Sequence, residues 1–213
     1  MFNLPQTSSV FRVIPKNAFD NYTNTRQKKL FTDQIHKIIW KNKLSIETIN
    51  LSGHDIQEIQ IFEIELKDKY DIKELLNIMN RAIPYHLIAV VNWKNEFYIS
   101  ATAKHLNVAN ENLAVIDYVF QSDWKLISEN PYQLELKNDL DWVFANFCEQ
   151  LSGVTSLSGQ TIEKLIEKNV ETDKLKNKIY KLEAAIKKEK QFNRKVELNQ
   201  KLKTLKDQLS TLD

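Results

Sequence analysis

The chain has little glycine, proline and cysteine for its 213 residues. Its three glycines, Gly53, Gly153 and Gly159, are too few for glycine-rich phosphate-binding loops or for a sandwich with many tight turns. The single cysteine, Cys148, excludes an intramolecular disulfide and a cysteine-rich zinc site, and we expect it to be an inert core residue.

The sequence also lacks any run of 18 apolar residues, so we expect no membrane-spanning segment and no membrane partner. Its first nine residues have neither the positive nor the apolar region of a secretory signal, which favours a cytoplasmic protein. The four histidines share no metal-ligand spacing. We therefore predict no metal site and no cofactor.

What the chain does have is a stretch dense in Ile, Val, Phe and Tyr, from Ile56 to Thr102. It reads as strand, helix, strand, turn and strand, at residues 56–67, 71–84, 86–93, 94–96 and 97–102. We expect Asp71 to cap the helix, with Glu74 completing a capping box, and Pro84 to end it. The core of a globular domain is predicted here.

Around this centre, the spacing of apolar residues predicts further elements. They are a helix at 25–42, a short strand at 46–51, a polar connection at 104–112, a strand at 113–120, irregular chain at 126–136 and a helix from Asp139 to Leu151. We therefore predict a globular domain at residues 1–152 and a linker at 153–159, where small polar residues surround two of the three glycines.

The spacing of apolar residues in 160–213 predicts a helical coiled-coil extension with two leucine seams. The first seam includes Leu182 and Ile186, and the second runs from Leu198 to Leu212 with alternating spacings of four and three. The two seams are out of phase. The extension is therefore either a hairpin, whose turn falls at 191–194, or one long helix that pairs with another chain.

The extension is also basic. Residues 174–206 carry 12 Lys or Arg against 3 acids, or +9, so the rest of the chain carries −7 for a net charge of +2. Lys174, Lys181, Lys188 and Lys195 recur every seven residues, so on one helix they would form a basic stripe. Such a stripe neutralises phosphates without reading sequence, whereas the same pattern also fits a solvated face or one that binds an acidic protein. The nucleic-acid-binding candidates are Lys174, Lys181, Lys187, Lys188, Lys190, Arg194 and Lys195.

One alternative is a magnesium-dependent nuclease. The strand around Glu63, Glu65 and Lys67 would place its apolar residues on one face and these three side chains on the other. Two carboxylates can hold Mg²⁺ and a lysine can orient the attacking water. The further acid that such a site needs would be Glu47. Because this alternation is also common in solvated edge strands, we expect no catalytic residue and treat the four as the alternative catalytic set.

Four short stretches of the sequence are distinctive. They are Ile14-Pro15-Lys16 followed by Phe19, Trp40 with Lys43-Leu44 and then Thr48 and Asn50, Ile83-Pro84 before a strand, and the segment 190–199. Together they resemble a bacterial family known as domain of unknown function 4391. Members tend to be encoded beside helicases and DNA methyltransferases. The resemblance therefore implies work with such a partner in restriction or antiviral defence.

These observations predict an α+β fold, with a mostly antiparallel sheet flanked by helices and a C-terminal helical coiled-coil extension. The predicted function is a non-enzymatic accessory or scaffold subunit of a nucleic-acid-processing system. We expect it to bind a partner protein, or a second copy, through the extension, and nucleic acid through the basic stripe.

Overall fold

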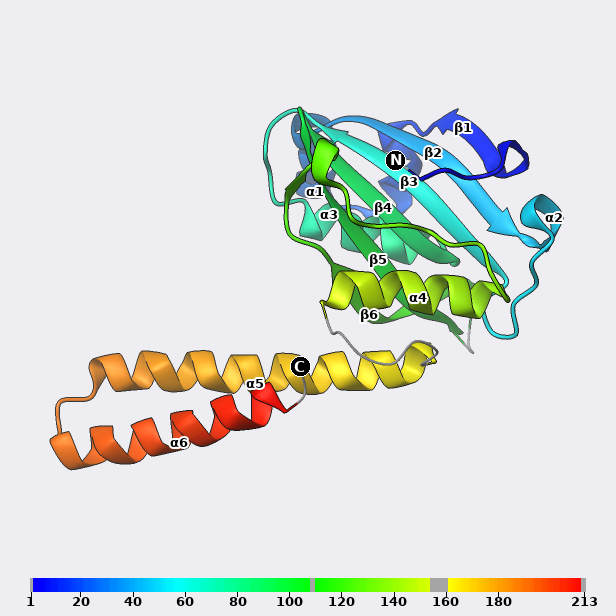
Figure 1. The fold of residues 1–213 in the computed structure, drawn as a ribbon. Helices are drawn as coiled ribbons and strands as arrows, with labels where there is room; N and C mark the ends of the chain where they lie inside the picture. The colour runs from blue at the N-terminus through cyan, green and yellow to red at the C-terminus, as the bar shows by residue number, and fades with distance from the viewer. Residues whose placement is uncertain (1, 108–109, 154–160, 212–213) are drawn as a thin grey trace. The chain divides into compact units, whose positions relative to one another are not determined.

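The computed structural model describes residues 2–107, 110–153 and 161–211, and it divides the chain into two compact units, Met1–Gly153 and Val154–Asp213 (Figure 1). In the first unit a sheet lies between helices. Its strands are β1 (Ser9–Val13), β2 (Ile35–Ser45), β3 (Glu58–Leu66), β4 (His86–Trp93), β5 (Glu96–Asn107), β6 (Asn110–Gln121) and β7 (Lys125–Leu126). Its helices are α1 (Thr25–Gln34), α2 (Ile46–Ile49), α3 (Lys73–Ala82) and α4 (Leu140–Ser152), with 3₁₀ turns η1 (Gln6–Ser8), η2 (Lys16–Tyr22) and η3 (Ile127–Glu129).

The strands follow the order β1-β2-β3-β4-β5-β6, and β7 pairs with β5. Every pair is antiparallel except β3 and β4, which run parallel because α3 carries the chain back between them. The predicted α+β fold with a mostly antiparallel sheet is therefore confirmed. The β4–β5 hairpin is also confirmed, with Trp93 opposite Glu96 and a turn at Lys94-Asn95.

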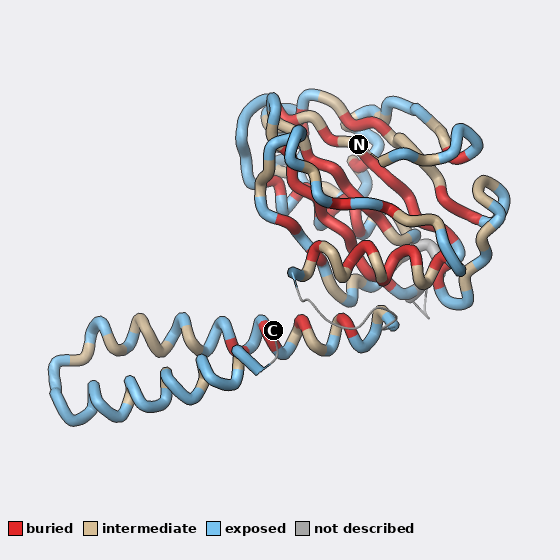
Figure 2. Tube along the Cα trace, in the orientation of Figure 1, coloured by how far each residue is buried: buried red, intermediate tan, exposed pale blue. Residues whose placement is uncertain are grey.

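One face of the sheet packs against α1, α3 and η2. Phe62, Ile64 and Leu66 of β3 point into this layer, as their alternation predicts. Phe19 of η2 and Phe31 of α1 stack with ring centroids 5.4 Å apart. Figure 2 shows the buried chain concentrated in the sheet and in the helices that cover it.

The other face is covered by α4, whose N-cap is Asp139, as predicted; its carboxylate accepts the Trp142 N–H. Phe144 packs edge-on against His86 at 4.7 Å, and Cys148 is fully buried. The carboxylate of Asp141 accepts three backbone N–H groups from residues 54–56. A side chain at Gly53 could not fit, because its Cβ would lie 1.9 Å from the Ile56 carbonyl oxygen.

The predicted helix at 25–42 is wrong in its second half. The helix α1 ends at Gln34, and β2 begins at Ile35. Two register shifts interrupt β2, one between Ile35 and Lys37 and one between Trp40 and Asn42. Each shift moves the apolar positions by one residue, so the strand shows no clean alternation.

Three smaller predictions also need correction. Residues 46–51 do not form a strand, because Ser45 and Thr48 make a capping box for the short helix α2. Asp71 lies before the N-cap of α3, and Glu74 binds Arg26 and Gln27 instead of closing a box. The polar connection at 104–112 is largely strand, since β5 extends to Asn107 and β6 begins at Asn110.

The second unit contains α5 (Ile162–Lys188) and α6 (Phe192–Ser210). The chain reverses at Glu189–Gln191, slightly before the turn considered from the sequence, and the two helices lie side by side (Figure 1). We call this pair the hairpin. The predicted linker falls mostly on residues 154–159, which lie outside the described part of the chain.

Candidate functional site

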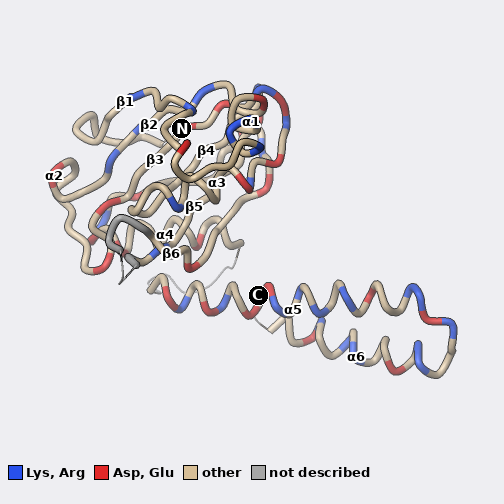
Figure 3. Tube along the Cα trace, turned by 180° about the vertical axis from the view of Figure 1, so that it is seen from behind, with Lys and Arg blue, Asp and Glu red and all other residues tan. Residues whose placement is uncertain are grey.

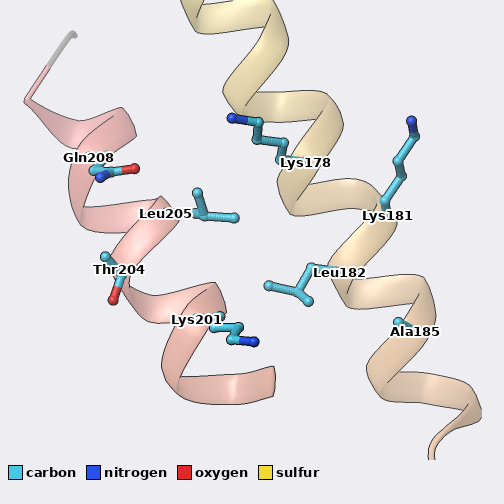
Figure 4. Close-up of a pocket in the computed structure, with 8 residues that line it drawn as sticks. All are labelled: Lys178, Lys181, Leu182, Ala185, Lys201, Thr204, Leu205 and Gln208. Atoms are coloured by element: carbon cyan, nitrogen blue, oxygen red, sulfur yellow. The ribbon is translucent and has the colours of Figure 1, made fainter. Parts of the chain in front are cut away.

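The hairpin is held together by apolar side chains facing across α5 and α6. In Figure 4, Leu182 of α5 and Leu205 of α6 point toward each other. The spacing of Leu198, Leu202, Leu205 and Leu209 puts one leucine on this side in nearly every turn of α6. All four are only partly buried, because two helices alone cannot enclose their common seam.

The turn of the hairpin is organised by Glu189. Its Oε1 accepts the N–H groups of Lys190 and Gln191 at 2.8 and 2.9 Å, and its Oε2 lies 3.4 Å from Arg194 Nε. The hydrogen bond from the Gln191 N–H does most to lower the pKa of Glu189, and the bond from Lys190 and the charge of Arg194 lower it further. The carboxylate is therefore charged at neutral pH. The turn therefore needs neither Gly nor Pro.

Five of the seven predicted basic residues gather at this turn, and we call them the tip cations. They are Lys187, Lys188, Lys190, Arg194 and Lys195. All five are exposed, and Figure 3 shows basic positions around the turn and along both helices. The other two predicted residues, Lys174 and Lys181, are exposed on α5 before the tip. Phe192, 79% exposed, adds an aromatic ring at the start of α6.

The chemistry that the tip offers is electrostatic. Ammonium and guanidinium groups attract phosphates and carboxylates. When they bind the phosphates of a nucleic acid, its counterions are released, so the affinity depends strongly on salt. Only Glu189 contributes a negative charge between residues 187 and 195. The exposed ring of Phe192 is available to stack on a base or to pack on an apolar surface.

Of the residues of the nuclease alternative, Glu47 is not brought to the others. Glu63 lies on β3 with its carboxylate 3.1 Å from Lys41 Nζ, and Glu65 stands opposite Lys37 of β2. Glu47, in α2, instead pairs with Lys43 at 3.2 Å. It lies near the other end of β3, because Ser45, just before α2, pairs with Glu58, the first residue of that strand.

The strand beside Glu63 and Glu65 supplies no further acid. β2 contains no Asp or Glu, and its basic residues there include Lys37 and Lys41. Lys67 follows the last residue of β3, exposed. Among the residues whose side chains the structure describes, no three His, Cys, Asp or Glu are arranged to hold a metal ion.

The same sheet face contains a cavity of about 240 Å³ that the sequence did not reveal. Ile61 and Val90 line it, Phe2 and Ile127 close it, and the Lys41–Glu63 ion pair lies at its edge. The Oδ1 atom of Asn92, which also lines it, is buried without a hydrogen-bond partner. The N-terminal residue Phe2 comes from far away in the sequence, so no local pattern could predict this cavity.

A second feature missed by the sequence is a buried amine. Lys104, 5% exposed, donates from Nζ to the Ile83 carbonyl oxygen at 2.8 Å, and burial lowers its pKa to about 7. Burial, and then the nearby Lys104, lower the pKa of His86 to about 4. Lys104 is one of the buried residues of the first unit, and His86 is partly buried against Phe144, so we assign no binding or catalytic role to either.

Comparison with known families gives one match. A family model described as a domain of unknown function, DUF4391, matches residues 2–209, which includes the sheet and most of the hairpin. Comparisons with curated proteins and with solved structures gave no match. In the part of the chain that the structure describes, no helix is long and apolar enough to cross a membrane.

Proposed function

The chain belongs to the DUF4391 family, and from the geometry of its hairpin we propose that it is a non-enzymatic accessory or scaffold subunit of a nucleic-acid-processing system. In this proposal the tip cations bind the phosphate backbone of DNA or RNA, and the hairpin, as an antiparallel coiled coil, also binds a protein partner. The single observation that carries the proposal is the gathering of five exposed cations around the hairpin turn.

Several features support a contact with phosphates. The tip cations come from two helices and the turn between them, so they face a ligand from more than one side. A contact built on Lys and Arg positions nucleic acid without reading its sequence, which suits a subunit whose partner supplies specificity. By resemblance, that partner is a helicase or a DNA methyltransferase of a restriction or antiviral-defence system in the cytoplasm.

The proposal is tested with the full chain and a labelled 30-base-pair DNA duplex, by fluorescence anisotropy at low salt. Changing the tip cations to Gln should weaken binding at least tenfold, because phosphate contacts supply most non-specific affinity. The matched control changes five exposed cations of the first unit to Gln. They are Lys28, Lys29, Lys73, Arg81 and Lys94.

The control variant loses the same five positive charges as the tip variant but leaves the tip cations intact, so its affinity for the duplex should fall little. Equal losses in the two variants would show that only net charge matters, and would refute a site at the tip. Absence of binding by the parent protein to duplex DNA, single-stranded DNA and RNA would refute the nucleic-acid role altogether.

A further inference from the structure

The hairpin has an apolar groove of about 560 Å³ along one side, lined by residues 178–185 of α5 and 201–208 of α6 (Figure 4). Leu182 and Ala185 of α5 and Leu205 of α6 provide its apolar lining. The groove runs between two parallel walls of helix, a shape that matches the side of a third helix. Apart from Lys181, one of the seven nucleic-acid-binding candidates, the proposed nucleic-acid role uses no residue of this surface.

The leucine seam between α5 and α6 lines the groove, and the two helices leave its side chains only partly buried. None of the described residues of α6 is buried, although leucines recur along it every three or four positions. An amphipathic helix draws most of its stability from packing its apolar face. A third helix in the groove would cover Leu182 and Leu205 and complete a three-helix bundle.

The charges of the groove are all of one sign. Its charged lining residues are Lys178, Lys181 and Lys201, and no Asp or Glu lines it among the described residues. Two acids of this region lie outside the groove lining. Glu183 lies two positions from Lys181 and so on the opposite flank of α5, where it binds Lys206, and Asp207 lies on α6. The groove therefore combines an apolar floor with a positive rim.

We propose that this groove binds an acidic amphipathic helix of a partner protein, with a Leu-type stripe on the floor and Glu or Asp facing the rim lysines. Apolar burial would supply affinity, and the opposite charges would select the partner and its orientation. A symmetric pairing of two copies would set lysine rim against lysine rim, which is repulsive. Nucleic acid would leave the leucines without an apolar partner.

This inference deepens the proposed scaffold role, because it names the surface that holds the protein partner. It concerns different residues from the tip cations, so the two proposals fail separately. If the parent protein binds DNA but not the acidic peptide described below, the groove proposal alone fails. If it binds the peptide but not DNA, the proposal for the tip cations alone fails.

The probe is a labelled 21-residue peptide of three heptads, with Leu at the two seam positions and Glu at the two flanking positions of each heptad. Its own glutamates repel one another and discourage self-pairing. At about 1.5 Å per residue it spans roughly 30 Å, enough to lie along the groove. We expect it to bind the full chain, and a peptide with Lys in place of Glu to bind at least tenfold more weakly.

Charge reversal tests the rim. The variant Lys178→Glu with Lys201→Glu should bind the Glu peptide at least tenfold more weakly than the parent protein does, and should bind the Lys peptide more tightly. The matched control, Lys176→Glu with Lys203→Glu, makes the same charge change at exposed positions outside the groove and should keep the original preference. Far-UV circular dichroism of each variant reports whether the helices remain folded.

Four outcomes would overturn the proposal. The first is failure of the folded parent protein to bind the Glu peptide. The second is equal binding of the two peptides, and the third is equal effects of the rim and control variants. The fourth is a dimer in sedimentation that Leu205→Gln abolishes, which would assign the groove to a second copy of this chain.

Discussion

Lys206 Nζ of α6 lies 2.8 Å from Glu183 Oε1 of α5, so a charged contact joins the two helices away from the groove. Both side chains are about half exposed, at 54% and 42%. Exposed pairs of this kind contribute little, since water and salt screen them. The stability of the hairpin therefore depends chiefly on its leucine seam.

This relationship predicts unequal effects of two substitutions. Glu183→Gln should leave hydrogen exchange in α6 almost unchanged at pH 7, whereas Leu205→Ala should speed it, because it removes seam contacts. The bond from Lys206 lowers the pKa of Glu183, so its small contribution is present above about pH 4.5 and fades as the pH falls. Faster exchange in Glu183→Gln than in Leu205→Ala would contradict this order.

We predict that residues 1–152 fold without the hairpin. The sheet has packed helices on both faces and a buried core that includes Phe62, Ile64 and Phe144. Limited proteolysis should cut near 154–159, within the small and polar sequence SGVTSLSG of residues 152–159, and leave a stable fragment. Aggregation of residues 1–152 whenever the hairpin is removed would show that the first unit depends on it.

Lys104 should make the stability of the first unit depend on pH. Its pKa is about 7 in the folded protein against an ordinary 10.5, so between these values the unfolded chain holds a proton that the folded one lacks. Stability should therefore rise from pH 7 toward pH 10.5, with a slope of up to about 1.4 kcal/mol per pH unit from this group. Lys104→Met should flatten that rise.

Urea unfolding at pH 7, 8 and 9 measures the slope for the parent and for Lys104→Met. The control Lys73→Met alters an exposed lysine and should leave the slope unchanged. If the parent and Lys104→Met show the same slope, the amine is already charged in the folded protein and its environment is not as dry as its 5% exposure indicates.

The sheet should have no nuclease activity. We expect Glu65→Ala with Lys67→Ala to leave the biological activity of the protein intact, because Glu47 is too far away to complete a metal site with Glu63 and Glu65. Supercoiled plasmid incubated with the parent and Mg²⁺ should remain supercoiled. Mg²⁺-dependent cleavage that the double variant abolishes would establish the nuclease alternative instead.

Local patterns predicted the elements whose apolar spacing is regular. The unit β3–α3–β4 and the helix α4 follow their sequence patterns closely, because each buries a face of constant period. The strand β2 does not. Its Ile35, Ile38 and Ile39 repeat at helical spacing, yet pairing with β3 over the whole strand outweighs that local preference.

The candidate sites also divide into those visible in the local sequence and those that depend on long-range contacts. The tip cations are close in sequence, so their gathering was visible as a charge run, whereas the groove required knowledge of how α5 and α6 face each other. The burial of Lys104 was hidden because its partner, the Ile83 carbonyl, belongs to another element. Long-range contacts of this kind leave no periodic signal in one sequence.

The most direct test of the central claim is the salt dependence of duplex DNA binding by the parent and by the variant in which the five tip cations become Gln. If these cations release counterions from phosphates, the slope of log affinity against log salt should fall in magnitude by about 4 in the variant. It should not change in the variant of the five control cations. An unchanged slope in the tip variant would contradict the account.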